Sequence, residues 1–151
     1  MLKGIDPLVS PPLMNALMGM GHGDEIVFAD ANFPAASHAQ RLIHYSGQPL
    51  IDVLRSALTL MPLDYAVDFS AILMAPPDPE SAPPAIWEDF TALLAGQENG
   101  GKPFVKLAKP EFYDRARRAY AIVATGERRR FSNIILRMGI VADKRELLSI
   151  A

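Results

Sequence analysis

The sequence predicts an α/β protein: one α/β/α layered domain, residues 1–151, on a mainly parallel, mixed sheet of about six short strands. First, short apolar runs alternate along the chain with longer segments whose apolar residues recur at helical spacing. Second, the short runs are apolar throughout, as in strands that are covered on both faces. Third, 151 residues suit a single domain without internal repeats, with 141–151 as a C-terminal extension.

Helices are expected where apolar residues lie three and four positions apart and where proline or glycine marks an end. They fall at about residues 11–20, 50–61, 86–94 and 110–118. Strands are expected at Glu25–Asp30, Arg41–Tyr45, Tyr65–Met74, Phe104–Ala108, Ala121–Ala124 and Asn133–Leu136. Ala31–Ala39 and the proline-rich Ala75–Pro84 are expected to be loops, and Val141–Ala151 a final helical turn or a frayed end.

Composition and charge exclude several kinds of function. The net charge of −2 and the pI near 5.9 give no electrostatic reason to expect a nucleic-acid partner. Without cysteine the chain forms no disulfide, iron–sulfur cluster or thiolate zinc site, which fits a cytoplasmic location. No apolar run approaches the length of a membrane span, and Gly4, Asp6 and Pro7 interrupt any signal peptide. We therefore expect no membrane partner.

The segment from Met20 to Asp30 carries the first candidate site. His22 lies between Gly21 and Gly23, which remove neighbouring side chains and allow positive φ, so its imidazole is expected at an open turn. Asp30 follows a short apolar strand, where open α/β sheets bind ligands, and either caps the next turn or binds ligand hydroxyls. Because histidine titrates near neutral pH, we expect both groups to lie within ångströms of each other and to exchange protons with a small polar ligand.

Other chemistries find little support. His38 and His44 are expected to be surface or hydrogen-bonded structural residues. The chain has no metal-binding histidine pair, serine nucleophile elbow, dinucleotide motif or phosphate loop, and we expect no metal or other cofactor. The arginine run 128–130 either clamps a phosphate or forms a solvated, salt-bridged surface. Phe131 and Asn133 offer an aromatic face and a carboxamide, which suit a sugar. The same pattern fits a phenylalanine in the core and an asparagine at the start of a strand.

Four blocks of sequence occur in one order across about residues 1–140. They are Pro7–Pro11, Met20–Pro34, Glu111–Ala116, and Ala121–Arg128 followed by Phe131–Leu136. In these blocks the chain resembles the sugar mutarotase and pyranase family, which includes L-fucose mutarotase and D-ribose pyranase. The runs Gly-His-Gly-Asp-Glu and Phe-Tyr-Asp-Arg-Ala favour the fucose branch.

The resemblance implies an isomerase that interconverts the α and β anomers of a free monosaccharide, L-fucose or a related sugar. His22 matches the family's catalytic histidine. Asp30 matches its substrate-binding aspartate, which we also expect to hold the imidazole ready. Family members form rings, commonly decamers, in which a neighbouring subunit completes each site. The implied partners are therefore a monosaccharide and further copies of the chain.

The same resemblance places Lys109 where the family has a basic or histidine residue against the sugar. Phe131, Ser132 and Asn133 fall on the family's aromatic–x–asparagine motif. Phe131 stands where tyrosine is usual and lacks its hydroxyl, and Lys109 offers a flexible point charge instead of a planar fork. These departures keep two alternatives open: a non-catalytic sugar-binding or regulatory module on the same scaffold, and a sugar-phosphate isomerase that uses Arg128–Arg130.

Overall fold

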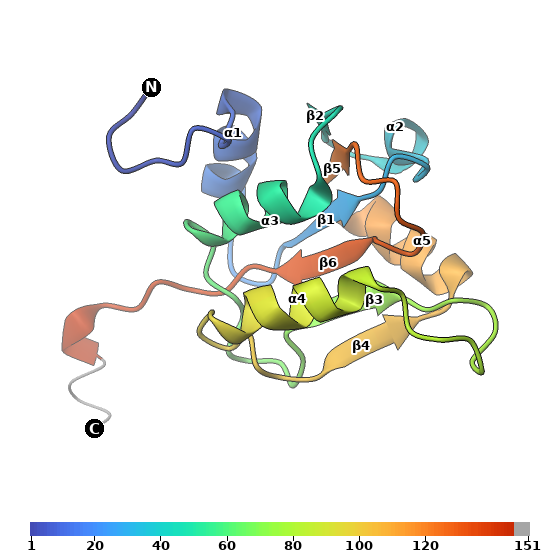
Figure 1. Ribbon diagram of the computed structural model, residues 1–151. Helices are drawn as coiled ribbons and strands as arrows, with labels where there is room; N and C mark the ends of the chain where they lie inside the picture. The colour runs from blue at the N-terminus through green and yellow to red at the C-terminus, as the bar shows by residue number, and fades with distance from the viewer. Residues whose placement is uncertain (147–151) are drawn as a thin grey trace.

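One mixed sheet forms the centre of the protein in the computed structural model, which describes residues 1–146 (Figure 1). Its strands are β1 (Glu25–Ala29), β2 (Leu42–Tyr45), β3 (Ala71–Met74), β4 (Phe104–Leu107), β5 (Ala121–Thr125) and β6 (Ile134–Arg137). They lie in the order β2-β5-β1-β6-β3-β4. Neighbours pair in parallel except at β6, which runs antiparallel to β1 and β3. The predicted sheet, mainly parallel and mixed, is confirmed.

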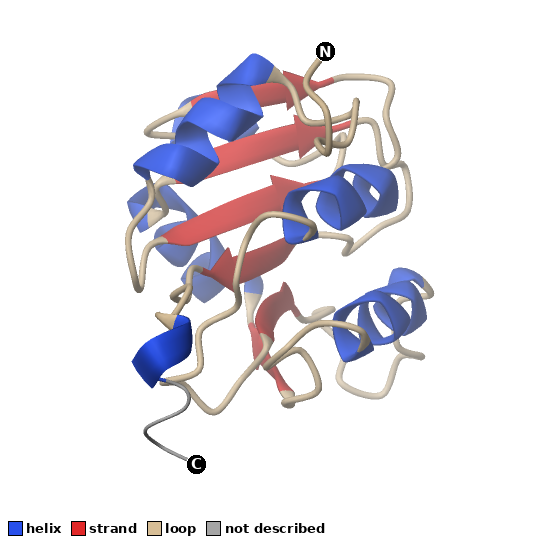
Figure 2. Ribbon diagram, turned by 90° about the vertical axis from the view of Figure 1, so that its left-hand side faces the viewer, coloured by secondary structure: helices blue, strands red, loops and turns tan. Residues whose placement is uncertain are grey.

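Helices cover both faces of this sheet, as Figures 1 and 2 show. On one face lie α1 (Pro11–Gly19), α3 (Leu50–Leu58) and α4 (Ile86–Ala95). On the other lie the short α2 (Ala35–His38) and α5 (Lys109–Arg118). The Ser10 side chain caps α1 by accepting the Leu13 N–H, and prolines open α1 and α5. The helices expected from apolar spacing are therefore confirmed.

Each face of the sheet has its own apolar core. Along β1, Ile26 and Phe28 point into the core under α1, α3 and α4, whereas Val27 and Ala29 point into the core under α2 and α5. All four side chains are fully buried, which explains why the strand is apolar at every position. Burying a side chain as large as Phe28 contributes about 1.5–3 kcal/mol, so these cores fix the position of β1 and of the turns at its ends.

Parts of the chain differ from the predicted elements. Residues 35–38 form α2 inside an expected loop, because one helical turn is too short to show a hydrophobic period. The expected strand Tyr65–Met74 begins only at Ala71, and residues 65–70 form a loop. Residues 144–146 form a helical turn, and the rest of the expected C-terminal turn, 147–151, lies outside the described residues. Within 1–146, every helix is too short or too polar to span a lipid bilayer.

Candidate functional site

The turn between α1 and β1 presents His22 to solvent. The Gly23 N–H donates to the Met138 carbonyl at 2.9 Å, which ties the turn to the end of β6. Gly23 has a φ of 90°, and a Cβ there would lie 3.0 Å from Arg137 Nη2, so the turn requires glycine at this position. The His22 side chain is 42% exposed. The imidazole therefore lies at an open turn, as its glycine neighbours predict.

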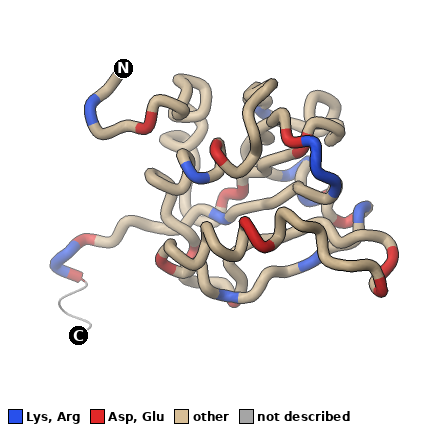
Figure 3. The backbone as a smooth tube through the Cα atoms, viewed as in Figure 1, with Lys and Arg blue, Asp and Glu red and all other residues tan. Residues whose placement is uncertain are grey.

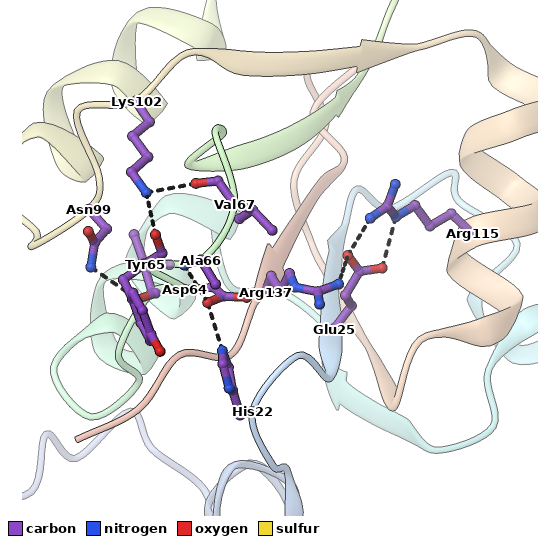
Figure 4. Close-up of polar contacts among 11 residues, drawn as sticks. His22, Glu25, Asp64, Tyr65, Ala66, Val67, Asn99, Lys102, Arg115 and Arg137 are labelled. Carbon is purple, nitrogen blue, oxygen red and sulfur yellow. Dashed lines mark hydrogen bonds and ion pairs between the residues drawn. The ribbon is translucent and has the colours of Figure 1, made fainter. Parts of the chain in front are cut away.

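Asp64 holds the imidazole from the protein side (Figure 4). His22 Nε2 lies 2.8 Å from Asp64 Oδ1, while Arg137 Nε donates to Asp64 Oδ2 at 2.7 Å and the Ala66 N–H donates to Oδ1 at 2.9 Å. The Asp64 side chain is 1% exposed. Burial alone would raise the pKa of this carboxyl, but the hydrogen bonds from Ala66, His22 and Arg137 lower it to about 2.

Two consequences follow for His22. Asp64 is ionised at neutral pH, so its negative charge stabilises the protonated imidazole. Among residues 1–146 no other hydrogen-bond partner reaches the His22 ring, which leaves Nδ1 available to a ligand. The pair can therefore take up and release a proton at a defined, solvent-facing atom.

Further charges behind Asp64 hold this arrangement in place. Arg137 also lies 4.0 Å from the Glu25 carboxylate. Arg115 of α5 binds the same carboxylate through two hydrogen bonds, of 2.9 Å and 2.7 Å. Figure 4 shows the resulting chain of alternating charges from His22 to α5. Since each carboxylate faces an arginine of the same chain, Arg137 is held in position against Asp64.

A second polar cluster lies at the opposite end of β1, around Asp30. The Asp30 N–H donates to Asn133 Oδ1 at 2.8 Å, and the Asn32 N–H donates to Asp30 Oδ1 at 3.0 Å. Burial raises the pKa of the Asp30 carboxyl, partly offset by hydrogen bonds from Asn32 and Ser132. Ser132 is fully buried, and its hydroxyl donates to the Arg129 carbonyl at 2.6 Å. Asp30, Ser132 and Asn133 thus form one ordered polar cluster.

Phe131 is held next to this cluster in an unusual backbone conformation. Its φ is 54°, in the left-handed region that bulky residues rarely adopt, at a cost of about 1–3 kcal/mol. The surrounding turn compensates for this cost: Arg129 bonds to Glu127 at 3.0 Å and to Asp89 of α4 at 2.8 Å. The Arg130 guanidinium lies 5.6 Å from the centre of the Phe131 ring. An aromatic residue with a strained backbone, held in place by hydrogen bonds of the surrounding turn, is typical of a functional site.

Lys109 reaches the same end of the sheet from the first residue of α5. Its ammonium lies 5.4 Å from the centre of the Tyr113 ring, within the range of a cation–π contact. Tyr113 packs edge-on against Phe33, at 5.1 Å, and against His38, at 5.2 Å. Because Phe33 follows Asp30 by three residues, this aromatic group connects Lys109 to the Asp30 cluster.

The structure separates two residues that the sequence predicts to lie together. His22 precedes β1 and Asp30 follows it, so five strand residues, at about 3.3 Å each, keep the two side chains on the order of 15 Å apart. A monosaccharide cannot bridge them within one chain, and Asp64 rather than Asp30 holds the imidazole. Both expectations are wrong. We therefore distinguish the His22 edge (His22, Asp64, Tyr65 and Arg137) from the Asp30 edge (Asp30, Lys109, Phe131, Ser132 and Asn133).

Several residues at these edges carry no sequence signal. Asp64 lies 42 positions from His22 along the chain, directly before the segment Tyr65–Met74 that the sequence predicts as a strand. Tyr113 lies on a helix face whose spacing equally fits a core position. His38 is a hydrogen-bonded residue, as expected, since its ring bonds to Ser37 and Arg117. Within residues 1–146 no three histidine, aspartate or glutamate side chains gather closely enough to hold a metal ion.

The fold and its two edges define a three-layered α/β protein. At one end of its buried central strand an exposed histidine is bonded to a buried aspartate, and at the other end lies a carboxylate–amide cluster. Residues 3–141 match the model of the RbsD / FucU transport protein family, and the chain belongs to this family.

Individual relatives agree with this assignment. Human fucose mutarotase is 41% identical over 147 residues, which cover 93% of this chain and 95% of that protein. The crystal structure of the fucose mutarotase from Streptococcus pneumoniae in complex with L-fucose is 43% identical, with a TM-score of 0.85 over 93% of this chain and 100% of that one. Bacillus subtilis RbsD complexed with D-ribose, 23% identical with a TM-score of 0.74 over 94% of this chain and 100% of that one, shares the fold.

Proposed function

We propose that the protein is an aldose mutarotase that interconverts the α and β anomers of a free monosaccharide, L-fucose or a related sugar. The observation that carries this proposal is the solvent-facing imidazole of His22, bonded at 2.8 Å to the buried, ionised carboxylate of Asp64. The similarity to fucose mutarotases over most of the chain supports the same reaction and the same substrate class.

The reaction needs only proton transfers. A cyclic sugar opens when its anomeric hydroxyl loses a proton and its ring oxygen gains one; the aldehyde then rotates and the ring closes on its other face. His22 Nδ1 exchanges these protons, and Asp64 stabilises the imidazolium that forms. Positioned acid–base catalysis accelerates a reaction about 10²–10⁴-fold, which is sufficient for a ring opening that already proceeds slowly in water.

The Asp30 edge supplies the groups that bind the sugar in this proposal. Asp30 and Asn133 offer a carboxylate and an amide to sugar hydroxyls, Lys109 a cation, and Phe131 an apolar face for C–H groups. Because this edge lies at the far end of β1 from His22, one site requires two copies of the chain. We infer a homo-oligomeric ring, a decamer as in the family, in which the sugar lies between His22 of one copy and Asp30 of the next. A cytoplasmic location stays a prediction.

The proposal is tested by saturation-transfer NMR on the α and β anomers of L-fucose. We expect the wild-type protein to accelerate exchange above the buffer rate and His22→Gln to return it to that rate. His44→Gln is the matched control, because His44 is an exposed residue on β2 and belongs to neither edge. An unchanged rate in His22→Gln would contradict the mechanism. Fucose, ribose, galactose and rhamnose measured side by side would identify the preferred sugar.

A non-catalytic sugar-binding module is the second candidate. It is favoured by Phe131, which lacks a hydroxyl, and by the contact of Lys109 with the Tyr113 ring. Calorimetric binding of fucose without anomer exchange would establish it. A sugar-phosphate isomerase is less well supported. Figure 3 shows the basic run, residues 128–130, in the loop that joins β5 to β6, but Arg129 is already bound to Glu127 and Asp89.

A further inference from the structure

Tyr65 leaves a large aromatic ring exposed directly beside His22. Among residues 1–146 it is the one exposed phenylalanine, tyrosine or tryptophan, with 56% of its surface accessible. Its ring lies almost parallel to the imidazole, with 5.7 Å between the two ring centres and 16° between their planes. Figure 4 shows the two rings side by side beneath Asp64. Neither apolar core accounts for this position, because Tyr65 belongs to neither.

The backbone that carries Tyr65 is fixed on both sides. The Lys102 ammonium donates to the Tyr65 carbonyl at 3.0 Å and to the Val67 carbonyl at 2.7 Å (Figure 4). Asn99 Nδ2 donates to the Leu63 carbonyl at 3.3 Å. Asp64, between them, is bonded to His22 and Arg137. These bonds replace the strand pairing that the sequence predicts here, and they position a ring that gains little from burial.

An aromatic face next to a proton-exchanging histidine is suited to a sugar. Sugars carry C–H groups that pack on aromatic rings, and the negative face of the ring also favours the protonated imidazole. Since His22 Nε2 is bonded to Asp64, a sugar oxygen must approach Nδ1, on the open side of the ring pair. Tyr65 restricts that approach on one face of the imidazole.

We propose that Tyr65 is a substrate-contacting residue that forms an aromatic wall at the His22 edge and selects sugars by packing against their C–H groups. This inference rests on the proposed function of His22. It assigns the contact to the ring face rather than to the hydroxyl, so Tyr65→Phe keeps this contact with the sugar and Tyr65→Leu loses it.

The test compares the full-length wild type with Tyr65→Leu and Tyr65→Phe, by NMR anomer exchange and by calorimetric binding of L-fucose. We expect Tyr65→Leu to raise KM and Kd about tenfold with kcat within about twofold, and Tyr65→Phe to match the wild type. Leu2→Ala is the control, because Leu2 is an exposed apolar residue that belongs to neither edge. Equal melting temperatures would show that the variants fold.

Each outcome decides a separate question. Unchanged KM and Kd in Tyr65→Leu overturn the proposal, and so does a loss confined to kcat, which would indicate that Tyr65 only orients His22. A wild type that binds fucose without exchanging its anomers overturns the proposed function instead. In that case the Kd of Tyr65→Leu still decides the role of Tyr65.

Discussion

A single hydrogen bond, between His22 Nε2 and Asp64, leaves Nδ1 as the imidazole nitrogen that is available to a ligand. In Asp64→Asn the imidazole loses the negative charge that stabilises its protonated form. We therefore expect anomer exchange to slow by about 100-fold, near the lower limit for acid–base catalysis. Saturation-transfer NMR measures this loss. Asp52→Asn is the control, since Asp52 forms an exposed pair with Arg55; an equal loss there would contradict the assignment.

Asp64 also makes stability depend on pH. Its folded pKa, about 2, lies below the ordinary value of 3.8, so the stabilisation is complete above about pH 4 and is lost as the pH falls towards 2. The size expected from this shift is about 2 kcal/mol. Urea unfolding between pH 2 and pH 6 should show a steeper loss in the wild type than in Asp64→Asn. Equal slopes would show that the carboxylate is not held as described.

Asp30 acts in the opposite direction. Burial raises the pKa of its carboxyl in the folded chain, so the protonated form is favoured by folding and this contribution to stability is lost as the pH rises through the folded pKa. The two aspartates therefore differ in kind. Asp64 is an ionised group held by the Arg137 guanidinium, the His22 imidazole and a backbone N–H, whereas Asp30 is a buried carboxyl held by backbone N–H groups and an amide. A carboxyl kept poorly solvated in this way gains from a ligand that supplies hydroxyl donors.

At the scale of elements, the turn between α1 and β1 depends on one glycine. Gly23 has a φ of 90°, and a Cβ there would lie 3.0 Å from Arg137 Nη2, the residue that holds Asp64. We expect Gly23→Ala to lower the free energy of unfolding by about 1–2 kcal/mol and to slow anomer exchange as Arg137 shifts. Gly21→Ala is the matched control, because its nearest neighbour would be 3.9 Å away. Denaturant unfolding and the NMR assay compare the two, and equal effects would contradict this explanation.

The elements show what the sequence can and cannot predict. β1, β5 and β6 are recognisable because burial on both faces makes them continuously apolar. The turn at His22 is recognisable because two glycines flank it. The loop at residues 65–70 is not, since side-chain bonds from Lys102, 37 and 35 positions away, fix it in place of a neighbouring strand. Asp64 escaped prediction for the same reason: its partners are distant in sequence, and local patterns carry no information about them.

At the scale of the whole molecule, β1 separates the groups that the reaction needs. His22 and Asp64 lie before the strand, whereas Asp30 and Asn133 lie after it. The strand is rigid, because it pairs with β5 and β6 on its two sides and is buried on both faces. Side-chain movements within one chain therefore cannot bring its two edges together. If both edges act on one sugar, the second edge must come from another copy.

Mixing two inactive variants tests this arrangement directly. His22→Gln removes the proton-exchanging group and keeps Asp30, whereas Asp30→Asn does the reverse, so each alone is expected to lose most of its activity. In mixed oligomers formed by co-expression, a shared site is intact when His22 comes from one variant and Asp30 from the other. Random assembly makes about one site in four intact, so anomer exchange should recover to about a quarter of the wild-type rate. Mixing His22→Gln with Asp64→Asn is the control. Both residues lie on the His22 edge, so every copy in this mixture has a defective His22 edge and no shared site is intact. Recovery in neither mixture would show that each chain acts alone, whatever its oligomeric state.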